Sequence, residues 1–427
     1  MLPGCLLYID PGTGSMLFSV LLGIFMAALF AFRKAWIRIK SLALGGRMEK
    51  IDQDKIPVVI FTDSKRYWTI FHPICDELER RGIRTEYWTE SEDDPAFDFE
   101  EGYKHISCKY IGNLNKAITK LNIMNAYICL STTPGLEVYQ WKRSKNTDMY
   151  IHIWHSVSSG LLYRMFGTDW YDVLMLPGDF IEENLRKLEK MRHMPPKVML
   201  QTGLPYFDVM AQEVKSRTFE HADTTTVLVA PTWGVNSLFN QLGDELLDRL
   251  IATGYNIIVR PHPQSYTAEA ELIDRLKKKY PENEHFHWNA DNDNLNVLGA
   301  SDIMISDHSA VVYDYAIIFD KPVIYSLVEF VKDPYDAWFI DEDPRIITIL
   351  PEMAHELKKE DLPGIKSIID EALVDTKKAE GRAYAREHFW YNHGEGANKC
   401  VDYIEAKLGE LQDAASDEGP ADSKKAG

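Results

Sequence analysis

Along most of the chain, short apolar runs alternate with segments whose apolar residues recur at helical spacing. Short runs rich in Val, Ile and Leu are typical of buried strands, and their alternation with helices predicts parallel βαβ units. Strands are expected at Pro57–Thr62, Ala126–Ser131, Met149–Trp154, Lys197–Gln201, Thr226–Ala230, Asn256–Arg260, Asp302–Ile305 and Pro322–Tyr325. Helices are expected at Tyr67–Arg81, Leu238–Thr253 and Glu269–Lys279. The pattern therefore predicts the α/β class.

A polar stretch, Val214–Thr225, interrupts this alternation and is typical of a link between domains. We therefore expect an N-terminal Rossmann-like domain over residues 47–218 and a C-terminal one over residues 219–408. Two such domains with a cleft between them form a GT-B-like arrangement, although periodicity alone permits other paired Rossmann-like folds. The tail over residues 409–427 is polar and rich in small residues, so we expect it to be disordered.

The N-terminal region, residues 1–46, carries a long apolar segment. Met16–Phe32 is nearly all apolar, and at about 1.5 Å per residue it is close to the length that spans a bilayer. Four basic residues follow it with no acid among them: Arg33, Lys34, Arg38 and Lys40. Since basic flanks stay on the cytoplasmic side, we expect one transmembrane helix with a short N-terminus outside and the body in the cytoplasm. An interfacial or buried helix is the alternative.

The net charge and the cysteine content argue against some classes of function. The formal net charge of −18 argues against a general nucleic-acid binder, so an anionic substrate has to meet a local basic or amide-rich pocket. The five cysteines are odd in number and contain no Cys-x-x-Cys pair, which favours neither a disulfide framework nor a zinc site. No metal signature is convincing, because the acids of Asp291-Asn292-Asp293 are explained more simply by a capped loop.

Arg260-Pro261-His262-Pro263 follows a β-branched run and is expected at the carboxyl end of a strand, the edge where open α/β sheets bind ligands. The guanidinium of Arg260 can bind phosphate oxygens, and the imidazole of His262 can donate a proton to a departing phosphate. A strand-terminating turn whose arginine pairs with a surface acid explains the tetrapeptide equally well.

Ser301–Asp320 is expected to form a strand, a polar turn and an apolar helix. The turn contains Ser306, Asp307, His308 and Ser309. Amides at a helix N-terminus and the hydroxyls of Ser306 and Ser309 suit a pyrophosphate, although ordinary N-capping needs no ligand. About one helical turn later, Asp314 can accept hydrogen bonds from ribose or alcohol hydroxyls.

Ile151–Gly160 predicts a strand that ends near His155 and a turn of small residues. A neutral imidazole at the edge of the inter-domain cleft can act as a general base toward an acceptor hydroxyl. For His152, inside the strand, a core histidine satisfied by hydrogen bonds is the simpler interpretation.

Together these motifs resemble those of the CDP-glycerol glycerophosphotransferases, which build teichoic-acid-type polymers. The resemblance spans roughly residues 125–405 and rests on Trp154-His155, Thr202-Gly203-Leu204-Pro205 with Asp208, Ala230-Pro231-Thr232-Trp233, Arg260-Pro261-His262-Pro263, Ser301–Asp320 leading into Lys321-Pro322, and His393-Gly394-Glu395-Gly396-Ala397. Several motifs in the family's order are more specific than any one of them.

The resemblance implies a GT-B fold and attack of an acceptor hydroxyl on the β-phosphorus of CDP-glycerol, with CMP leaving. It also implies two catalytic histidines, matched by His155 as the base and His262 on the leaving-group side. The donor would be a substrate, and no cofactor is implied. The acceptor would be a polymer or a lipid-linked hydroxyl at the bacterial inner membrane.

The chain departs from the family pattern at two places. Ser156-Val157-Ser158-Ser159 stands where the family has Gly-Thr-Pro and a nearby lysine. His308 and Ala310 replace a tyrosine and a serine in the phosphate turn. These departures leave ribitol or a sugar open as the donated group. Two further hypotheses are a nucleotide-sugar glycosyltransferase or epimerase-like enzyme, and a non-catalytic membrane-tethered scaffold.

Overall fold

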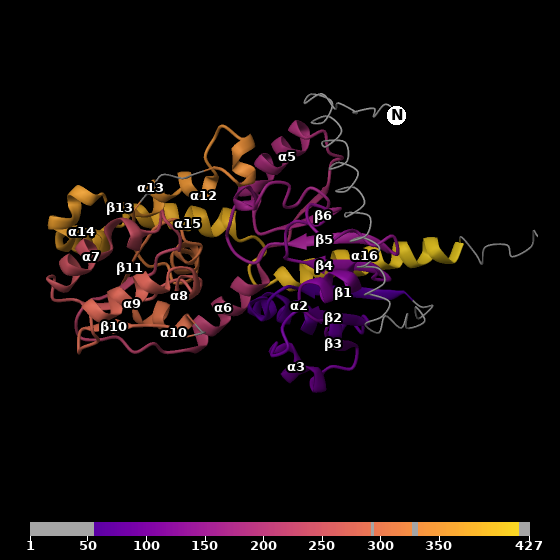
Figure 1. Cartoon of the computed structure of the whole chain (residues 1–427), viewed down its shortest axis with the longest axis horizontal. Helices are drawn as coiled ribbons and strands as arrows, with labels where there is room; N and C mark the ends of the chain where they lie inside the picture. Colours follow the sequence, from indigo (N-terminus) through magenta and orange to yellow (C-terminus); the bar gives the residue numbers. More distant parts are fainter. Residues whose placement is uncertain (1–54, 292–293, 327–331, 418–427) are drawn as a thin grey trace, which may run out of the picture. The chain divides into compact units, whose positions relative to one another are not determined.

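Two parallel sheets dominate the computed structural model, which describes residues 55–291, 294–326 and 332–417 (Figure 1). The first sheet has the strand order β3-β2-β1-β4-β5-β6-β7, and all its neighbouring strands run parallel. Its strands are β1 Ile56–Thr62, β2 Thr85–Thr89, β3 Ile106–Tyr110, β4 Ala126–Ser131, β5 Thr147–Ile153, β6 Val173–Leu176 and β7 Val198–Gln201. The first six strands thus follow the doubly wound Rossmann order.

The second sheet repeats this order. Its strands are arranged β10-β9-β8-β11-β12-β13 and are again parallel throughout. They are β8 Thr226–Val229, β9 Asn256–Val259, β10 Phe286–Trp288, β11 Ile303–Ser306, β12 Val323–Tyr325 and β13 His355–Glu356. In such sheets the order reverses at one point, here between β1 and β4 and between β8 and β11, and ligands bind at the carboxyl ends of the strands there.

Buried aliphatic side chains explain why these runs are strands. In β8 and β11 every residue is buried, as expected for parallel strands covered on both faces. One apolar core cluster includes Val59 and Leu174 of the first sheet together with Leu228 and Met304 of the second. Residues 56–427 accordingly form one compact unit that holds both sheets.

Helices connect the strands. Those of the first half are α2 Trp68–Arg80, α3 Ala96–Phe99, α4 Asn115–Leu121, α5 Glu182–Met191 and α6 Pro205–Ser216. Those of the second half are α7 Leu238–Ile251, α8 Ser265–Ala268, α9 Ala270–Lys279, α10 Leu295–Ala300, α11 Val311–Tyr313, α12 Arg345–Thr348, α13 Leu350–Met353, α14 Ile365–Val374 and α15 Lys377–Phe389. A π-helical turn, Asp314–Ile318, continues α11. The polar stretch 214–225 begins in the last turn of α6 and ends just before β8.

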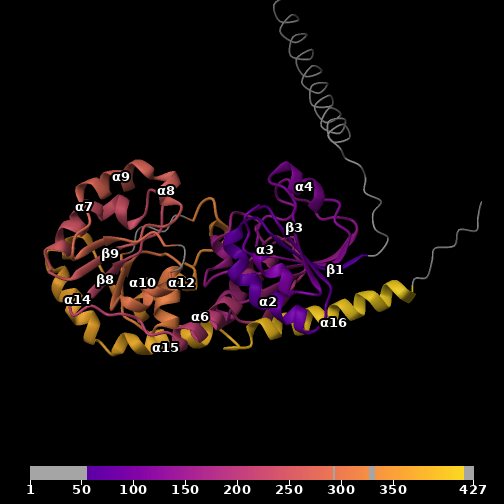
Figure 2. The same cartoon turned by 90° about the horizontal axis from the view of Figure 1, so that it is seen from below.

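The last helix, α16 (Gly396–Asp417), packs against α2 and β4 (Figures 1 and 2). Its buried residues Cys400, Val401 and Ile404 belong to the core cluster of the first sheet. The expected assignment of residues 219–408 to the second domain is therefore wrong for this helix. The expected disorder from residue 409 is wrong as far as Asp417, because Leu408 and Leu411 still pack on that cluster and extend the helix.

The expected transmembrane helix lies outside the described residues. Among the helices that the structure describes, none is both long and apolar enough to cross a membrane.

Candidate active site

His155 follows β5 at the carboxyl edge of the first sheet, as expected. Its imidazole is half-buried, and its Nδ1 lies 2.8 Å from the hydroxyl oxygen of Thr132, the residue that follows β4. Because β4 and β5 are neighbouring parallel strands, their carboxyl ends place these two residues side by side. The contact engages Nδ1 and leaves Nε2 as the nitrogen available to a substrate. Burial, assisted by the charge of Arg66, lowers the pKa of His155 to about 4, so the imidazole is neutral at physiological pH.

An aromatic ring lies against His155. The ring centroid of Tyr67 is 4.9 Å from that of the imidazole, and Tyr67 comes from the loop between β1 and α2. The loop after β1 therefore reaches across β4 to the end of β5. Neither Tyr67 nor Thr132 belongs to a motif that the sequence pattern singled out; only their position directly after buried strands could have indicated them.

His152 is buried inside β5, and its Nε2 lies 3.1 Å from the hydroxyl of Tyr163. Burial lowers its pKa to about 3. His152 is thus a core histidine, as expected, but its hydrogen bonding is incomplete, because the buried Nδ1 has no partner among the described residues.

His262 follows β9 at the carboxyl edge of the second sheet. Its Nδ1 accepts a hydrogen bond of 3.1 Å from the backbone N–H of Gln264. A backbone N–H can only donate, so Nδ1 carries no proton in the neutral ring and the proton sits on Nε2. Burial lowers the pKa of His262 and favours this neutral form. The local turn thus prepares Nε2 as a hydrogen-bond donor.

Arg260 is held by the loop that follows β10. Its guanidinium donates to the side-chain oxygen of Asn289 and, at 2.9 Å, to the carbonyl oxygen of Asp291. These bonds fix the orientation of the side chain. A guanidinium has five N–H donors in a planar fork that matches the oxygens of a phosphate.

The turn after β11 is tied to the loop after β8. The carboxylate of Asp307 accepts hydrogen bonds from the backbone N–H groups of Thr232, at 2.8 Å, and Leu238, at 3.0 Å. It also accepts one from the N–H of Ser309, and burial raises its pKa. Asp307 therefore links the turn after β11 to the loop after β8 at the point where the strand order reverses. Thr232 takes part in this link through its backbone N–H.

Ser306 requires a correction. Its side chain is fully buried, and its hydroxyl donates at 2.6 Å to the carbonyl oxygen of Ala230 in the neighbouring chain segment. A phosphate cannot replace this bond without opening the sheet, so we no longer assign Ser306 to phosphate binding. Ser309 lies at the start of α11, next to the half-buried His308, and its hydroxyl stays our candidate for that role.

Asp314 begins the π-helical turn after α11 and is buried, with 8% of its surface exposed. One carboxylate oxygen, Oδ1, has no hydrogen-bond partner among the described residues. Burial raises the pKa of Asp314 to about 7. A buried carboxyl group with an unused acceptor is costly unless a ligand hydroxyl satisfies it.

Two further motifs, around Gly203 and around His393, bind each other. Gly203 has φ +87°, and a Cβ atom there would lie 2.0 Å from the carbonyl oxygen of Tyr391. Asp208 accepts hydrogen bonds from the N–H groups of Gly394 and Gly396, and from Nε1 of Trp390. These residues therefore fix the segment between α15 and α16, and the role of Gly203 is structural.

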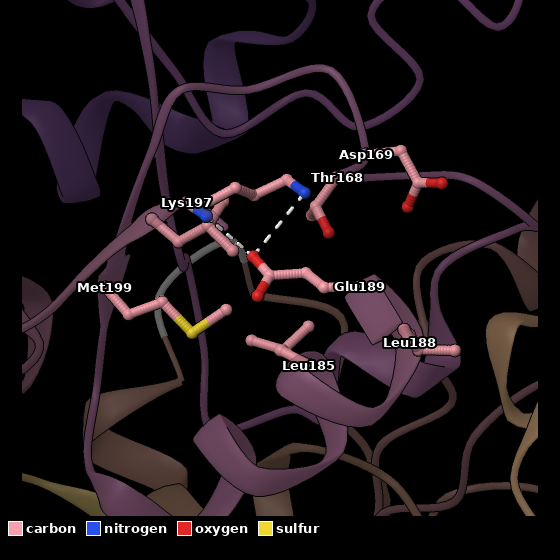
Figure 3. Close-up of a pocket in the computed structure, with 8 residues that line it drawn as sticks. Thr168, Asp169, Leu185, Leu188, Glu189, Lys197 and Met199 are labelled. Atoms are coloured by element: carbon pink, nitrogen blue, oxygen red, sulfur yellow. Dashed lines mark hydrogen bonds and ion pairs between the residues drawn. The ribbon is translucent and has the colours of Figure 1, made fainter. Parts of the chain in front are cut away.

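A small cavity of about 10 Å³ lies away from these groups, between α5 and strands β6 and β7 (Figure 3). Lys197 and Glu189 interact across it, through the Lys197 backbone N–H at 2.9 Å and Nζ at 3.7 Å. It has room for about one water molecule and none for a nucleotide.

The charge of Arg66 connects the two predicted histidines, since it contributes to lowering the pKa of both His155 and His262. His262 in turn lies near Trp233, with ring centroids 6.5 Å apart, and Trp233 follows the Thr232 that binds Asp307. Loops after β1, β5, β8, β9 and β11 thus supply the candidate site.

Residues 115–406 match the family model of CDP-glycerol:poly(glycerophosphate) glycerophosphotransferases. The chain belongs to this family. A relative of this chain is the teichoic acid poly(glycerol phosphate) polymerase of Bacillus spizizenii, 25% identical over 189 residues. The match covers 40% of this chain and 45% of that polymerase, so it spans less than half of the relative's length.

Two solved structures share the fold of this chain. The wall teichoic acid polymerase TagF, soaked with CDPG, superposes with a TM-score of 0.55 at 18% identity, over 90% of this chain and 99% of that chain. A putative UDP-N-acetylglucosamine 2-epimerase from Listeria monocytogenes gives 0.54 at 17% identity, over 84% and 98%. These likenesses confirm the GT-B-like α/β fold. The family match includes every site residue expected from the sequence, whereas Arg66 and Tyr67 precede it.

Proposed function

We propose that this glycerophosphotransferase moves a glycerol-phosphate unit from CDP-glycerol to a hydroxyl group of a cell-envelope polymer or lipid-linked acceptor, with release of CMP. Family membership over residues 115–406 supports the reaction class. The observation that carries the proposal is the fixed tautomer of His262, whose Nδ1 accepts the Gln264 N–H.

In the proposed reaction the acceptor oxygen attacks the β-phosphorus of the donor. His155 Nε2 takes the proton of the acceptor hydroxyl, and the bond between the β-phosphorus and the bridging oxygen breaks. The bridging oxygen keeps the electron pair and leaves as part of CMP, while His262 Nε2–H hydrogen-bonds or protonates it. Phosphoryl transfer depends mostly on positioning and charge stabilisation, so two oriented imidazoles and phosphate-binding groups suffice for this scheme.

Arg260 and Ser309 are proposed to bind the donor phosphates. Arg260 is pre-oriented by Asn289 and Asp291, which reduces the entropy lost when a phosphate binds. Asp314 is proposed to accept a hydrogen bond from a ribose or glycerol hydroxyl through the unpartnered Oδ1. The donated alcohol is thus glycerol in this proposal, with ribitol or a sugar as the alternatives to test.

The proposal places the body of the enzyme at the cytoplasmic face of the bacterial inner membrane, anchored through Met16–Phe32. The support is the apolar length of this segment and the four basic residues that follow it. We expect the full chain to stay in the membrane fraction after washing at high pH. Complete release by that wash would contradict an integral anchor.

The function is tested by incubating the purified full chain with CDP-glycerol, CDP-ribitol or UDP-sugars and membrane-derived acceptor, and measuring released CMP or UDP. CMP release from CDP-glycerol is expected, and His155→Ala and His262→Ala should each reduce it by about 10²-fold or more. His105→Ala and His287→Ala, which remove exposed imidazoles, serve as matched controls and should leave it unchanged.

Other outcomes identify the alternatives. UDP release would favour a nucleotide-sugar enzyme of the same fold. CMP release from CDP-ribitol alone would change the donor but keep the mechanism. No turnover with any donor would favour a scaffold without catalytic activity.

A further inference from the structure

Arg66 lies where the strand order of the first sheet reverses. It belongs to the short 3-10 turn Lys65–Tyr67 that follows β1, and β1 pairs with β4 on one side and β2 on the other. Thr132 and His155 follow the next two strands, β4 and β5, at the same edge. By topology alone, Arg66 therefore lies at the edge where a doubly wound sheet binds its ligand.

Local contacts with Ser64 and Tyr67 hold the side chain of Arg66. Ser64 caps the turn, and its hydroxyl oxygen accepts hydrogen bonds from the backbone N–H of Arg66 at 3.4 Å and from its Nε at 3.2 Å. The guanidinium carbon lies 5.9 Å from the ring centroid of Tyr67, whose ring is the one that lies against His155. Ser64 thus engages Nε, which leaves the two terminal nitrogens as the fork that binds oxyanions bidentately.

The guanidinium of Arg66 enters no ion pair with any residue that the structure describes. By contrast, nine other arginines pair with carboxylates: Arg80, Arg81, Arg143, Arg186, Arg192, Arg217, Arg275, Arg345 and Arg382. The chain has 65 acidic residues against 47 lysines and arginines, so acidic partners are abundant. Asp63 is close enough for the charge of Arg66 to lower the pKa of its carboxyl group, yet the two form no ion pair. An exposed arginine without an ion pair to any described residue suits an anionic ligand.

The charge of Arg66 affects the pKa of one histidine in each half of the site. Burial lowers the pKa of both His155 and His262, and the positive charge of Arg66 lowers both pKa values further. His155 belongs to the first sheet and His262 to the second, so the guanidinium lies within electrostatic reach of both. Among the described residues, it is the one charged group that acts on the pKa of both histidines.

We propose that Arg66 binds the transferred phosphoryl group directly and stabilises its charge in the transition state, a role that rests on the function proposed above. While the acceptor O–H bond breaks and its proton passes to His155 Nε2, the new O–P bond forms and the bond to CMP opens. The non-bridging oxygens of the β-phosphorus carry negative charge throughout. The terminal nitrogens of Arg66 donate to these oxygens and approach them from the side of the first sheet.

The test compares Arg66→Ala and Arg66→Lys with a matched control, Arg80→Ala. Arg80 is the last residue of α2, about 20 Å along the helix from Arg66, and its side chain is exposed. Both alanine variants remove one positive charge from the chain. For each variant we would measure CMP release from CDP-glycerol across pH, together with thermal unfolding to verify folding.

Arg66→Ala is expected to lower kcat by about 10²-fold, with Arg66→Lys in between, whereas Arg80→Ala should match the wild type. In Arg66→Ala the acidic limb of the pH profile should also move to higher pH, because the charge that lowers the pKa of His155 is gone. The other groups around His155 that can titrate are Tyr67, His152 and Asp63. Arg66 also lowers the pKa of Tyr67 and of Asp63, so in Arg66→Ala these two pKa values should rise as well.

The possible failures are distinct. If the wild type releases CMP and Arg66→Ala equals Arg80→Ala in both rate and pH profile, the role of Arg66 is overturned while the proposed function stands. A drop in rate without the shift of the acidic limb, or full activity of a folded Arg66→Ala, also overturns it. If the wild type releases no CMP, the proposed function fails first.

Discussion

The Nδ1 atom of His155 lies 2.8 Å from the hydroxyl oxygen of Thr132. For His155 to accept a proton at Nε2, its own proton has to sit on Nδ1 and be donated to Thr132. The hydroxyl of Thr132 can accept from Nδ1–H and so supports this tautomer and the orientation of the ring, a positioning role that needs no contact with the substrate.

Replacing Thr132 by valine keeps the shape and removes this acceptor. We expect kcat for CMP release to fall by about tenfold, which corresponds to roughly 1.4 kcal/mol, with little change in the KM for CDP-glycerol. Thr132→Ser keeps the hydroxyl and should restore most of the rate. Equal activity of the valine and serine variants would show that the hydroxyl does not set the tautomer.

Arg260 and His155 should separate donor binding from chemistry. Arg260→Ala is expected to weaken the binding of CDP-glycerol by about tenfold or more, because it removes phosphate contacts, whereas His155→Ala should leave the Kd nearly unchanged. Calorimetric titration of each variant measures this. Asn289→Ala, which loosens the orientation of Arg260, should lie between them. Equal dissociation constants for the Arg260 and His155 variants would contradict the division of roles.

Asp314 should make stability depend on pH. Its folded-state pKa of about 7 lies above that of an unfolded aspartate, about 4. Between these values the folded chain keeps a proton that the unfolded chain has lost, so the free energy of unfolding falls as pH rises through this window. Asp314→Asn removes this ionisation. Its free energy of unfolding should therefore rise relative to that of the wild type between pH 5 and pH 8, by roughly 2–4 kcal/mol.

Urea denaturation at both pH values measures this difference, with the exposed Asp274→Asn as the control. The same variant should lose activity if the carboxylate binds a substrate hydroxyl. A stability gain that is identical at pH 5 and pH 8 would mean that Asp314 titrates normally.

Asp208 should matter for stability rather than for chemistry. Asp208→Ala leaves the N–H groups of Gly394, Gly396 and Trp390 Nε1 without their acceptor, and we expect a loss of about 2–4 kcal/mol in the free energy of unfolding. Cleavage by proteases near residues 390–396 should become faster. Asp413→Ala on the exposed side of α16 is the control, and equal stability of the two variants would count against the proposed role of Asp208.

The sequence pattern predicted the strands that carry the candidate site because their composition is typical of buried strands. β9 and β11 are rich in aliphatic residues, and β5 ends in the buried run Tyr150–Ile153, so the sequence predicted that His155, His262 and Ser309 follow the ends of strands. β2, with the sequence TEYWT, was not predicted, because a short run of mixed composition does not differ clearly from helix or loop. β6, with VLML, was also missed, although it is as short and as apolar as β11.

Side-chain partners could not be predicted in the same way. Ser306 was predicted to bind phosphate because serines at helix starts often do. In the structure, its hydroxyl donates to the carbonyl oxygen of Ala230, which lies 76 residues earlier in the sequence. The return of α16 to the first sheet is likewise a long-range packing event that no local pattern encodes. Arg66 was missed because its importance comes from what lies around it rather than from its own sequence context.

The return of α16 also has a consequence for how the enzyme is made. Cys400, Val401 and Ile404 complete the core beside α2, although the strands of that sheet are synthesised some two hundred residues earlier. While the ribosome is still translating the second sheet, the nascent first sheet therefore presents an uncovered apolar surface. A premature stop codon just before residue 396 would leave that surface open permanently and expose the product to proteolysis and aggregation.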